Sequence, residues 1–202
     1  MSERLFNSAY SAMVFAFNFA HQAYDPPVMN KLGWGPLNRI SKGLSGTAGA
    51  AQSGLILSRL TRLTIPQQNV VVAKFAPHTW PCSCRAPCCA GKKPNGEWEQ
   101  AICDLGTIAS HDCLDGCSPN RALREGIIRK IFGDNALTLE QLAVRTGVSE
   151  RTAKSHSILI KRWLCGEKHP KTGSEVGLIE ITLSRAETLL EEAGLICEEL
   201  PY

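Results

Sequence analysis

Long uninterrupted apolar runs are missing from this chain. The most apolar stretch, residues 5–20, includes Asn7, Ser8, Ser11 and Asn18, and it is shorter than the roughly 20 residues that a membrane-spanning helix needs. It also lacks the positively charged start and the cleavage context of a secretory signal. We therefore expect a buried N-terminal helix and no association with a membrane.

Signatures of catalysis are missing as well. The sequence has no paired carboxylates in a convincing acidic motif, no phosphate-cradling glycine loop and no nucleophile–base signature, so we expect no enzyme. It also has no convincing internal repeat or low-complexity tract. A hydrophobic content of 44% with 20% charged residues is typical of a globular chain. At 202 residues the chain forms one or two domains with a normal core.

Charge is present but uneven. Residues 119–172 hold eleven lysines and arginines against five carboxylates, a local net charge of +6. Residues 173–202 hold one arginine and seven glutamates, a net charge of −6. A positive block of this size favours contact with phosphates. For the acidic segment we expect a solvated helix face, with docking on the basic block or on a partner as alternatives.

The positive block contains a pattern typical of a helix-turn-helix, in residues 138–164. Thr138 with Gln141 predicts a capping box that begins a first helix. Gly147 stands where the turn needs a left-handed residue, and Ser149 predicts the cap of a second helix. The alternative is an ordinary helical hairpin with basic residues in solvent.

The second helix, SERTAKSHSILIKRWL, resembles the recognition helix of LuxR-type and sigma-factor region-four domains. In this sequence Ala153 replaces a larger aliphatic residue, and Ser157 stands where an apolar residue normally packs. The resemblance implies that the start of this helix lies at the DNA groove. For His156 we weigh a phosphate contact equally against a partly buried histidine. The residues predicted to contact DNA are Arg145, Ser149, Glu150, Arg151, Thr152, Lys154, Ser155, His156, Lys161 and Arg162.

A cluster of cysteines lies between residues 82 and 89. Four thiols within eight residues supply the soft ligands that a structural zinc ion prefers, although the spacing differs from the usual pairs. The alternatives are buried thiols packed as small apolar groups, an iron–sulfur cluster and a catalytic thiol. In a protein with a DNA-reading motif, nine cysteines indicate a reducing cytoplasm. The predicted zinc ligands are Cys82, Cys84, Cys88 and Cys89.

The expected fold is mostly α-helical, with a helical N-terminal region, a Cys-rich loop and a C-terminal tri-helical helix-turn-helix. Helices are predicted near 4–22, 47–63, 66–76, 96–109, 120–133 and 178–196, with 66–76 also readable as a strand because of its valine run, and with a loop over 165–177. Small residues at Ala48, Ala51 and Gly54 predict the packing face of the second helix. The expected segments are 1–77, 78–118, 119–172 and 173–202.

The stretch KFAPHTWPCSCRAPCCAGKKPNGEWEQAI, followed by a helix-turn-helix, resembles uncharacterised phage and prophage proteins. Some phage late-gene antiterminators have a similar organisation. We therefore expect a phage-encoded transcription regulator in the bacterial cytoplasm that binds double-stranded DNA. The alternative is an antiterminator or other host-interaction protein whose helix-turn-helix grips RNA polymerase. Aromatic residues around the first helix also predict a homodimer.

Overall fold

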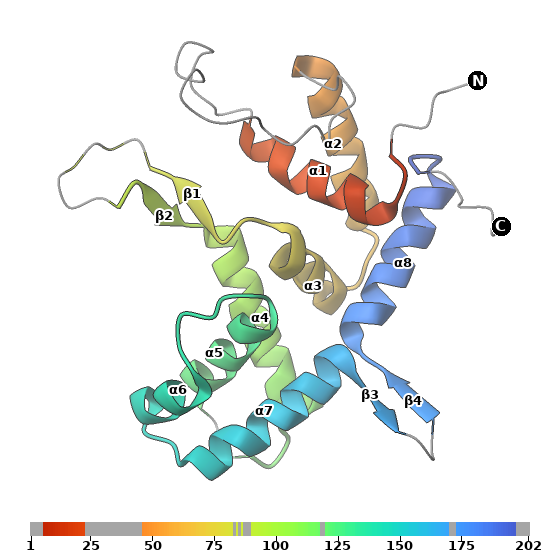
Figure 1. The fold of residues 1–202 in the computed structure, drawn as a ribbon. Helices are drawn as coiled ribbons and strands as arrows, with labels where there is room; N and C mark the ends of the chain where they lie inside the picture. Colours follow the sequence, from red (N-terminus) through yellow and green to blue (C-terminus); the bar gives the residue numbers. More distant parts are fainter. Residues whose placement is uncertain are drawn as a thin grey trace. The chain divides into compact units, whose positions relative to one another are not determined.

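A computed structural model describes residues 6–22, 46–82, 84, 86, 90–117, 120–169 and 173–196. Over these ranges the chain forms eight helices and two short hairpins, which confirms the mostly helical class (Figure 1). The helices are α1 (Ala9–Gln22), α2 (Gly46–Leu60), α3 (Ile65–Phe75), α4 (Gly96–Asp112), α5 (Arg121–Ile131), α6 (Leu139–Thr146), α7 (Glu150–Cys165) and α8 (Leu178–Glu192). The strands are β1 (Thr79–Pro81), β2 (Lys92–Pro94), β3 (Gly166–His169) and β4 (Gly173–Val176).

The chain divides into two compact units. The first comprises Met1–Leu63, Phe75–Pro77 and Ser184–Tyr202, and the second comprises Thr64–Lys74 and His78–Leu183. The predicted Cys-rich and helix-turn-helix segments thus fall within one unit. None of the described helices is long and apolar enough to cross a membrane.

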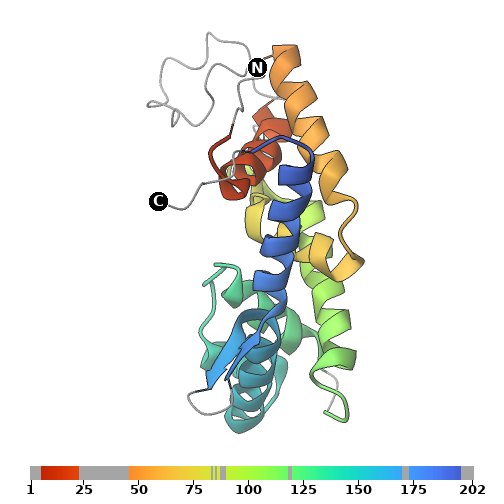
Figure 2. The ribbon, with the colours of Figure 1, turned by 90° about the vertical axis from the view of Figure 1, so that its right-hand side faces the viewer.

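The core of the first unit forms where α1 crosses α2 (Figures 1 and 2). The Ser53 hydroxyl donates a hydrogen bond of 3.0 Å to the carbonyl of Ala16, which satisfies a polar group that is 97% buried. The contact face of α2 carries Gly49, Ser53, Ile56 and Leu60, all buried. The face predicted from Ala48, Ala51 and Gly54 was wrong, because these three residues are exposed.

Aromatic side chains of α1 and its approach are mostly covered within the first unit. Phe6, Phe15 and Phe17 are buried, and Phe15 contacts both Phe6 and Phe19 with ring centroids 5.1 and 5.3 Å apart. Tyr10 is 61% exposed although its ring meets the edge of Phe75. The expected buried N-terminal helix is therefore confirmed, with Tyr10 as its large exposed side chain.

Trp98 anchors the second unit. Its ring is almost fully buried, and its indole Nε1–H donates a hydrogen bond of 3.0 Å to the carbonyl of Ala73 in α3. The Arg129 guanidinium of α5 lies 5.0 Å from the ring centroid and forms an ion pair with Glu99. A bidentate arginine over a buried aromatic ring fixes α5 against α4, since both contacts depend on the orientation of the guanidinium. Residues 65–75 form a helix, so the alternative strand does not occur.

The two hairpins were not predicted. In one, β1 pairs with β2 in antiparallel register, with Trp80 opposite Lys93. In the other, β3 pairs with β4 directly after α7, where a loop was expected. Gly166 permits the close approach of β4 to the start of β3, because a Cβ atom there would lie 2.2 Å from the carbonyl oxygen of Glu175. Both hairpins lack the alternation of apolar and polar residues from which strands are recognised in a sequence.

Within the acidic segment, Leu178–Glu192 form the expected helix with solvated carboxylates, while Gly173–Val176 form β4 and Glu198 and Glu199 lie outside the described residues. Glu180, Glu187, Glu191 and Glu192 of α8 are all exposed. The buried side of α8 carries Thr182, Ala186, Leu189 and Leu190. Burial of the apolar stripe and exposure of the glutamates are what a surface helix requires.

Candidate nucleic-acid interface

The turn between α6 and α7 forms as its residues predicted. Thr138 and Gln141 make a reciprocal capping box at the start of α6. Gly147 ends α6 with φ of 66°, in the left-handed region that favours glycine. The Ser149 hydroxyl accepts a hydrogen bond of 3.1 Å from the backbone amide of Thr152. Each cap contributes about 1 kcal/mol to the helix that it begins.

Helix α5 completes a tri-helical unit, since it contacts both α6 and α7. Asn120 links its start to the turn: the side chain accepts from the amide of Leu123 and donates to the carbonyl of Thr146 at 3.1 Å. Gly126 lets α6 approach closely, because an added Cβ atom would lie 2.6 Å from both terminal methyl carbons of Leu142. Neither residue was recognised in the sequence. Gly126 meets Leu142 and Asn120 reaches Thr146, both far along the chain, although the cap that Asn120 makes with Leu123 is local.

The inner face of α7 is apolar. Ala153, Ile160 and Leu164 are fully buried, and Ser157 is half-buried. Ala153 therefore packs in the core despite being smaller than the aliphatic residue expected from the resemblance. These buried positions follow helical spacing and leave the opposite face of α7 open to solvent.

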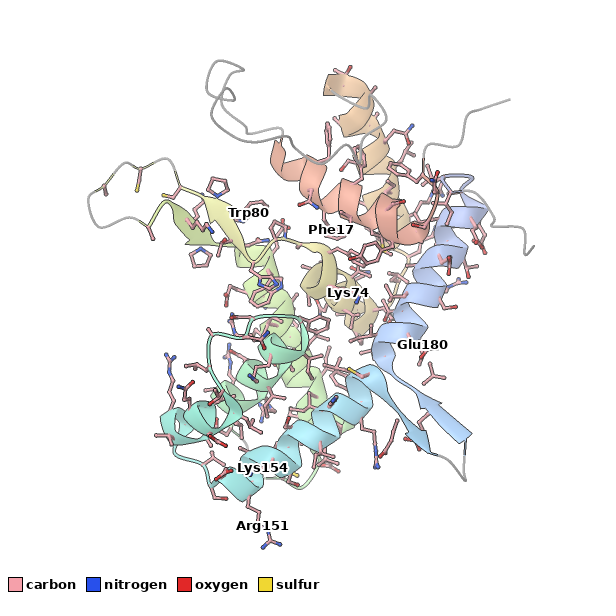
Figure 3. All side chains as sticks on the ribbon, viewed as in Figure 1. Phe17, Lys74, Trp80, Arg151, Lys154 and Glu180 are labelled. Carbon is pink, nitrogen blue, oxygen red and sulfur yellow. The ribbon has the colours of Figure 1, made fainter. Side chains whose placement is uncertain are left out.

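The outer face of α7 carries the predicted basic residues. Arg151, Lys154, Lys161 and Arg162 are exposed, together with Ser155. Figure 3 shows the Arg151 side chain extending away from the helices of its unit. Lys154 forms an ion pair with Glu150, which raises the pKa of its ammonium group above the ordinary value. The exposed face of α7 thus carries four cations and one carboxylate, that of Glu150.

The remaining predicted contacts lie at the turn, in the first turn of α7 and on α6. Ser149, Glu150 and Arg145 are exposed, while Thr152 is half-buried. The Ser149 and Thr152 hydroxyls lie 2.8 Å apart. Because Ser149 already caps α7, its side chain contributes to the position of the helix before any contact with a ligand.

His156 faces inward and leaves the set of exposed residues. It is 4% exposed, and no described residue forms a hydrogen bond with its Nδ1. Burial lowers the pKa of this imidazole below the ordinary value of 6.5, and the nearby Arg124 guanidinium lowers it further. A neutral imidazole in the core matches the second of its two predicted roles, so the phosphate contact is withdrawn.

The hairpin β3–β4 extends directly from the end of α7. Arg162 forms an ion pair with Glu167 of β3, and Glu167 stands opposite Glu175 in the register. One of the four exposed cations is therefore partly neutralised by the element that follows the helix. The contact joins the hairpin to the basic face.

The cysteine cluster lies in the loop of the other hairpin. The amide of Cys82 donates a hydrogen bond of 2.8 Å to the carbonyl of Gly91, which continues the β1–β2 ladder past Pro81. Cys84 is exposed, and Cys88 and Cys89 lie outside the described residues. Within the ranges that the structure describes, no three potential ligands gather around one point. The zinc site therefore stays a prediction.

No protein-family model, curated protein or solved structure matches this chain. The features of this chain that bear on function are therefore the geometry and charge of the α5–α7 unit.

Proposed function

We propose that this protein is a sequence-specific regulator of transcription that binds double-stranded DNA, with α7 in the major groove. The observation that carries the proposal is the outer face of α7, where Arg151, Lys154, Lys161 and Arg162 are all exposed. An α-helix fits the major groove, and cations along its outer face neutralise the flanking phosphates. The caps at Ser149 and Gly147 hold α7 in a fixed direction for this contact.

The roles of the residues differ. Arg151 and Ser155, near the start of α7, are placed to read base edges, since the first turns of a recognition helix enter the groove. Lys161, Arg162 and Arg145 of α6 are placed to hold phosphates. Glu150 keeps Lys154 on the helix surface until a phosphate or base replaces it.

The first prediction concerns this face. Arg151→Ala and Lys154→Ala should each weaken specific binding, by about 1–3 kcal/mol where a base contact is lost. Loss of a phosphate contact should also reduce the dependence of log Kd on log salt by about one. Electrophoretic shift at fixed salt, with a duplex enriched from a random pool, measures the affinity, and a salt series measures the slope.

Arg185→Ala is the matched control, because Arg185 is exposed on α8 and the substitution removes the same charge far along the sequence. Affinity that is unchanged in both α7 variants contradicts the assignment of the face. Equal weakening by Arg185→Ala indicates a loss of general charge instead of a local contact.

A second candidate function is binding of RNA polymerase, as in an antiterminator. Val144 supports it, since this large apolar side chain on α6 is 83% exposed. A Val144→Ser variant should then weaken a polymerase complex while DNA binding alone persists. A complex on DNA that forms only when polymerase is present favours this second function.

The wider proposal is for a non-enzymatic, phage- or prophage-encoded protein of the bacterial cytoplasm. It rests on the sequence resemblance and on the absence of a catalytic signature in the sequence. We also propose a structural zinc ion in the loop after β1 and a homodimer through the first unit. Their tests are given in the Discussion.

A further inference from the structure

Ile158 is the centre of the outer face of α7. Its side chain is 64% exposed, and the buried side chains of His156 and Ile160 lie on the opposite face. At helical spacing, Arg151 and Ile158 share one line along the helix. Lys154 and Arg162, each four residues from Ile158, lie on either side of that line. An apolar side chain thus stands among four cations.

Single exposed apolar residues are common on protein surfaces. Ile158 differs from such residues in its position among the cations of α7. Extended apolar patches mark protein interfaces, whereas Ile158 is the one large apolar side chain of α7 that is more than half exposed. Its neighbours on the face are cations, which suit a polyanion. DNA is such a polyanion, and the apolar group that it exposes in the major groove is the 5-methyl group of thymine.

We propose that Ile158 reads a thymine methyl group in the major groove and that it is a specificity-determining residue of this protein. The inference rests on the proposed DNA binding and adds the class of base that the centre of α7 selects. The side chain suits the task, since a β-branched residue in a helix has one strongly preferred χ1 rotamer. Its γ-methyl group is therefore held in place before DNA arrives.

The spacing along α7 gives the proposal a register. Ile158 lies seven residues after Arg151, about 10 Å along the helix axis at ~1.5 Å per residue. This length equals about three base-pair steps of ~3.4 Å. The selected thymine should therefore lie about three base pairs from the base that Arg151 contacts when α7 follows the groove.

The test replaces each thymine of the enriched duplex by uracil, which removes the methyl group and leaves base pairing intact. Uracil at one position per site should weaken wild-type binding about threefold to fivefold, the effect of one buried methyl-sized group. In Ile158→Ala the same uracil should have no effect. Ile158→Val should keep part of it, because it retains a β-branched side chain.

Val144→Ala is the matched control, because Val144 is also exposed and apolar but lies on α6. It should leave the response to uracil unchanged. Ile158→Ala should fold, since alanine is favoured in a solvated helix, and its circular dichroism confirms this. If a specific duplex is found but no uracil substitution has an effect that differs between the wild type and Ile158→Ala, the inference is overturned while the proposed DNA binding stands. Failure to enrich any duplex overturns the proposed function, and the inference with it.

Discussion

At the scale of single residues, His156 shows how the core of the helix-turn-helix depends on protonation. The imidazole is buried beside Arg124 of α5, and both effects lower its pKa below 6.5. A charged imidazole in this position would face a cation without a compensating carboxylate among the groups that shift its pKa. The folded unit therefore favours the neutral form of His156.

The second prediction follows from this linkage. In the unfolded chain His156 binds a proton as pH falls through about 6.5, while the folded chain does not until a lower pH. Stability is therefore full above this pH and declines below it, by at most about 1.4 kcal/mol per pH unit for one proton. Urea unfolding at pH values of about 7.5 and about 5.5 measures the loss.

His156→Gln provides the comparison, because glutamine is of similar size and does not titrate. Its loss of stability between the two pH values should be smaller than that of the wild type. Glu99, whose pKa is lowered from 4.5 by its hydrogen bond to Arg129, adds to the loss only at more acidic pH. An equal loss in both proteins excludes His156 as the source.

The third prediction contrasts two glycines on helices. Gly126→Ala should destabilise the α5–α6 contact by about 1–2 kcal/mol net, because the new methyl group overlaps Leu142 and overpacking exceeds the gain in helix propensity. Gly54→Ala should stabilise α2 by about 0.5–1 kcal/mol, since nothing lies within 4 Å of the added atom. Peptide-resolved hydrogen exchange measures the stability of each helix separately. If both substitutions stabilise their helix, or both destabilise it, the packing described here is contradicted.

At the scale of elements, the two hairpins bear on the proposed DNA-binding face and on the proposed zinc loop. β3–β4 continues from α7 and takes Arg162 into an ion pair. β1–β2 holds the loop in which the four clustered cysteines stand. A ladder that continues to Cys82 and Gly91 brings the two ends of this loop together, which reduces the entropy lost when the loop closes around an ion.

The fourth prediction concerns this loop. Metal analysis of untagged protein should find near-stoichiometric zinc, and a chelator should lower the melting temperature, because ligand thiolates add folding energy. Cys82→Ser and Cys84→Ser should lose the metal. Cys165→Ser should keep it, since that thiol is exposed at the end of α7. Metal-free protein of unchanged stability instead supports the alternative of packed thiols.

At the scale of the whole molecule, the net charge and the exposed apolar side chains differ from one segment of the chain to another. The net charge of +3 hides a basic helix-turn-helix and an acidic final segment. Among the described aromatic residues of the first unit, Phe6, Phe15, Phe17 and Phe75 are buried. The side chains left to form a dimer interface are Tyr10 and Leu55, which are 61% and 44% exposed. Paired half-sites on DNA would still favour two copies of α7.

The fifth prediction is the assembly state. Light scattering at micromolar concentration should give twice the chain mass of 22.0 kDa. Tyr10→Glu should reduce it to one chain mass, because a carboxylate opposes burial at an interface. Lys74→Glu is the control, since Lys74 is exposed but is not apolar. A monomer that persists on DNA refutes the dimer.

The sequence by itself determined the caps and the turn of the helix-turn-helix. Thr138, Gly147 and Ser149 act on backbone groups within three or four residues, so their effect can be read from local order. The class of the fold followed as well, because the apolar residues of α5, α6 and α7 repeat at helical spacing. The same spacing placed Arg151, Lys154, Lys161 and Arg162 away from the apolar side.

Tertiary structure alone decided the burial of certain residues and the position of the short strands. His156 is buried by its neighbours in the unit, Gly126 matters because Leu142 approaches it, and α2 packs through Ser53 instead of Gly54. The strands of three or four residues carry no periodic signal of their own. Each of these outcomes depends on a partner that is distant in the sequence, and the local preference of a residue for helix or strand does not reveal such a partner.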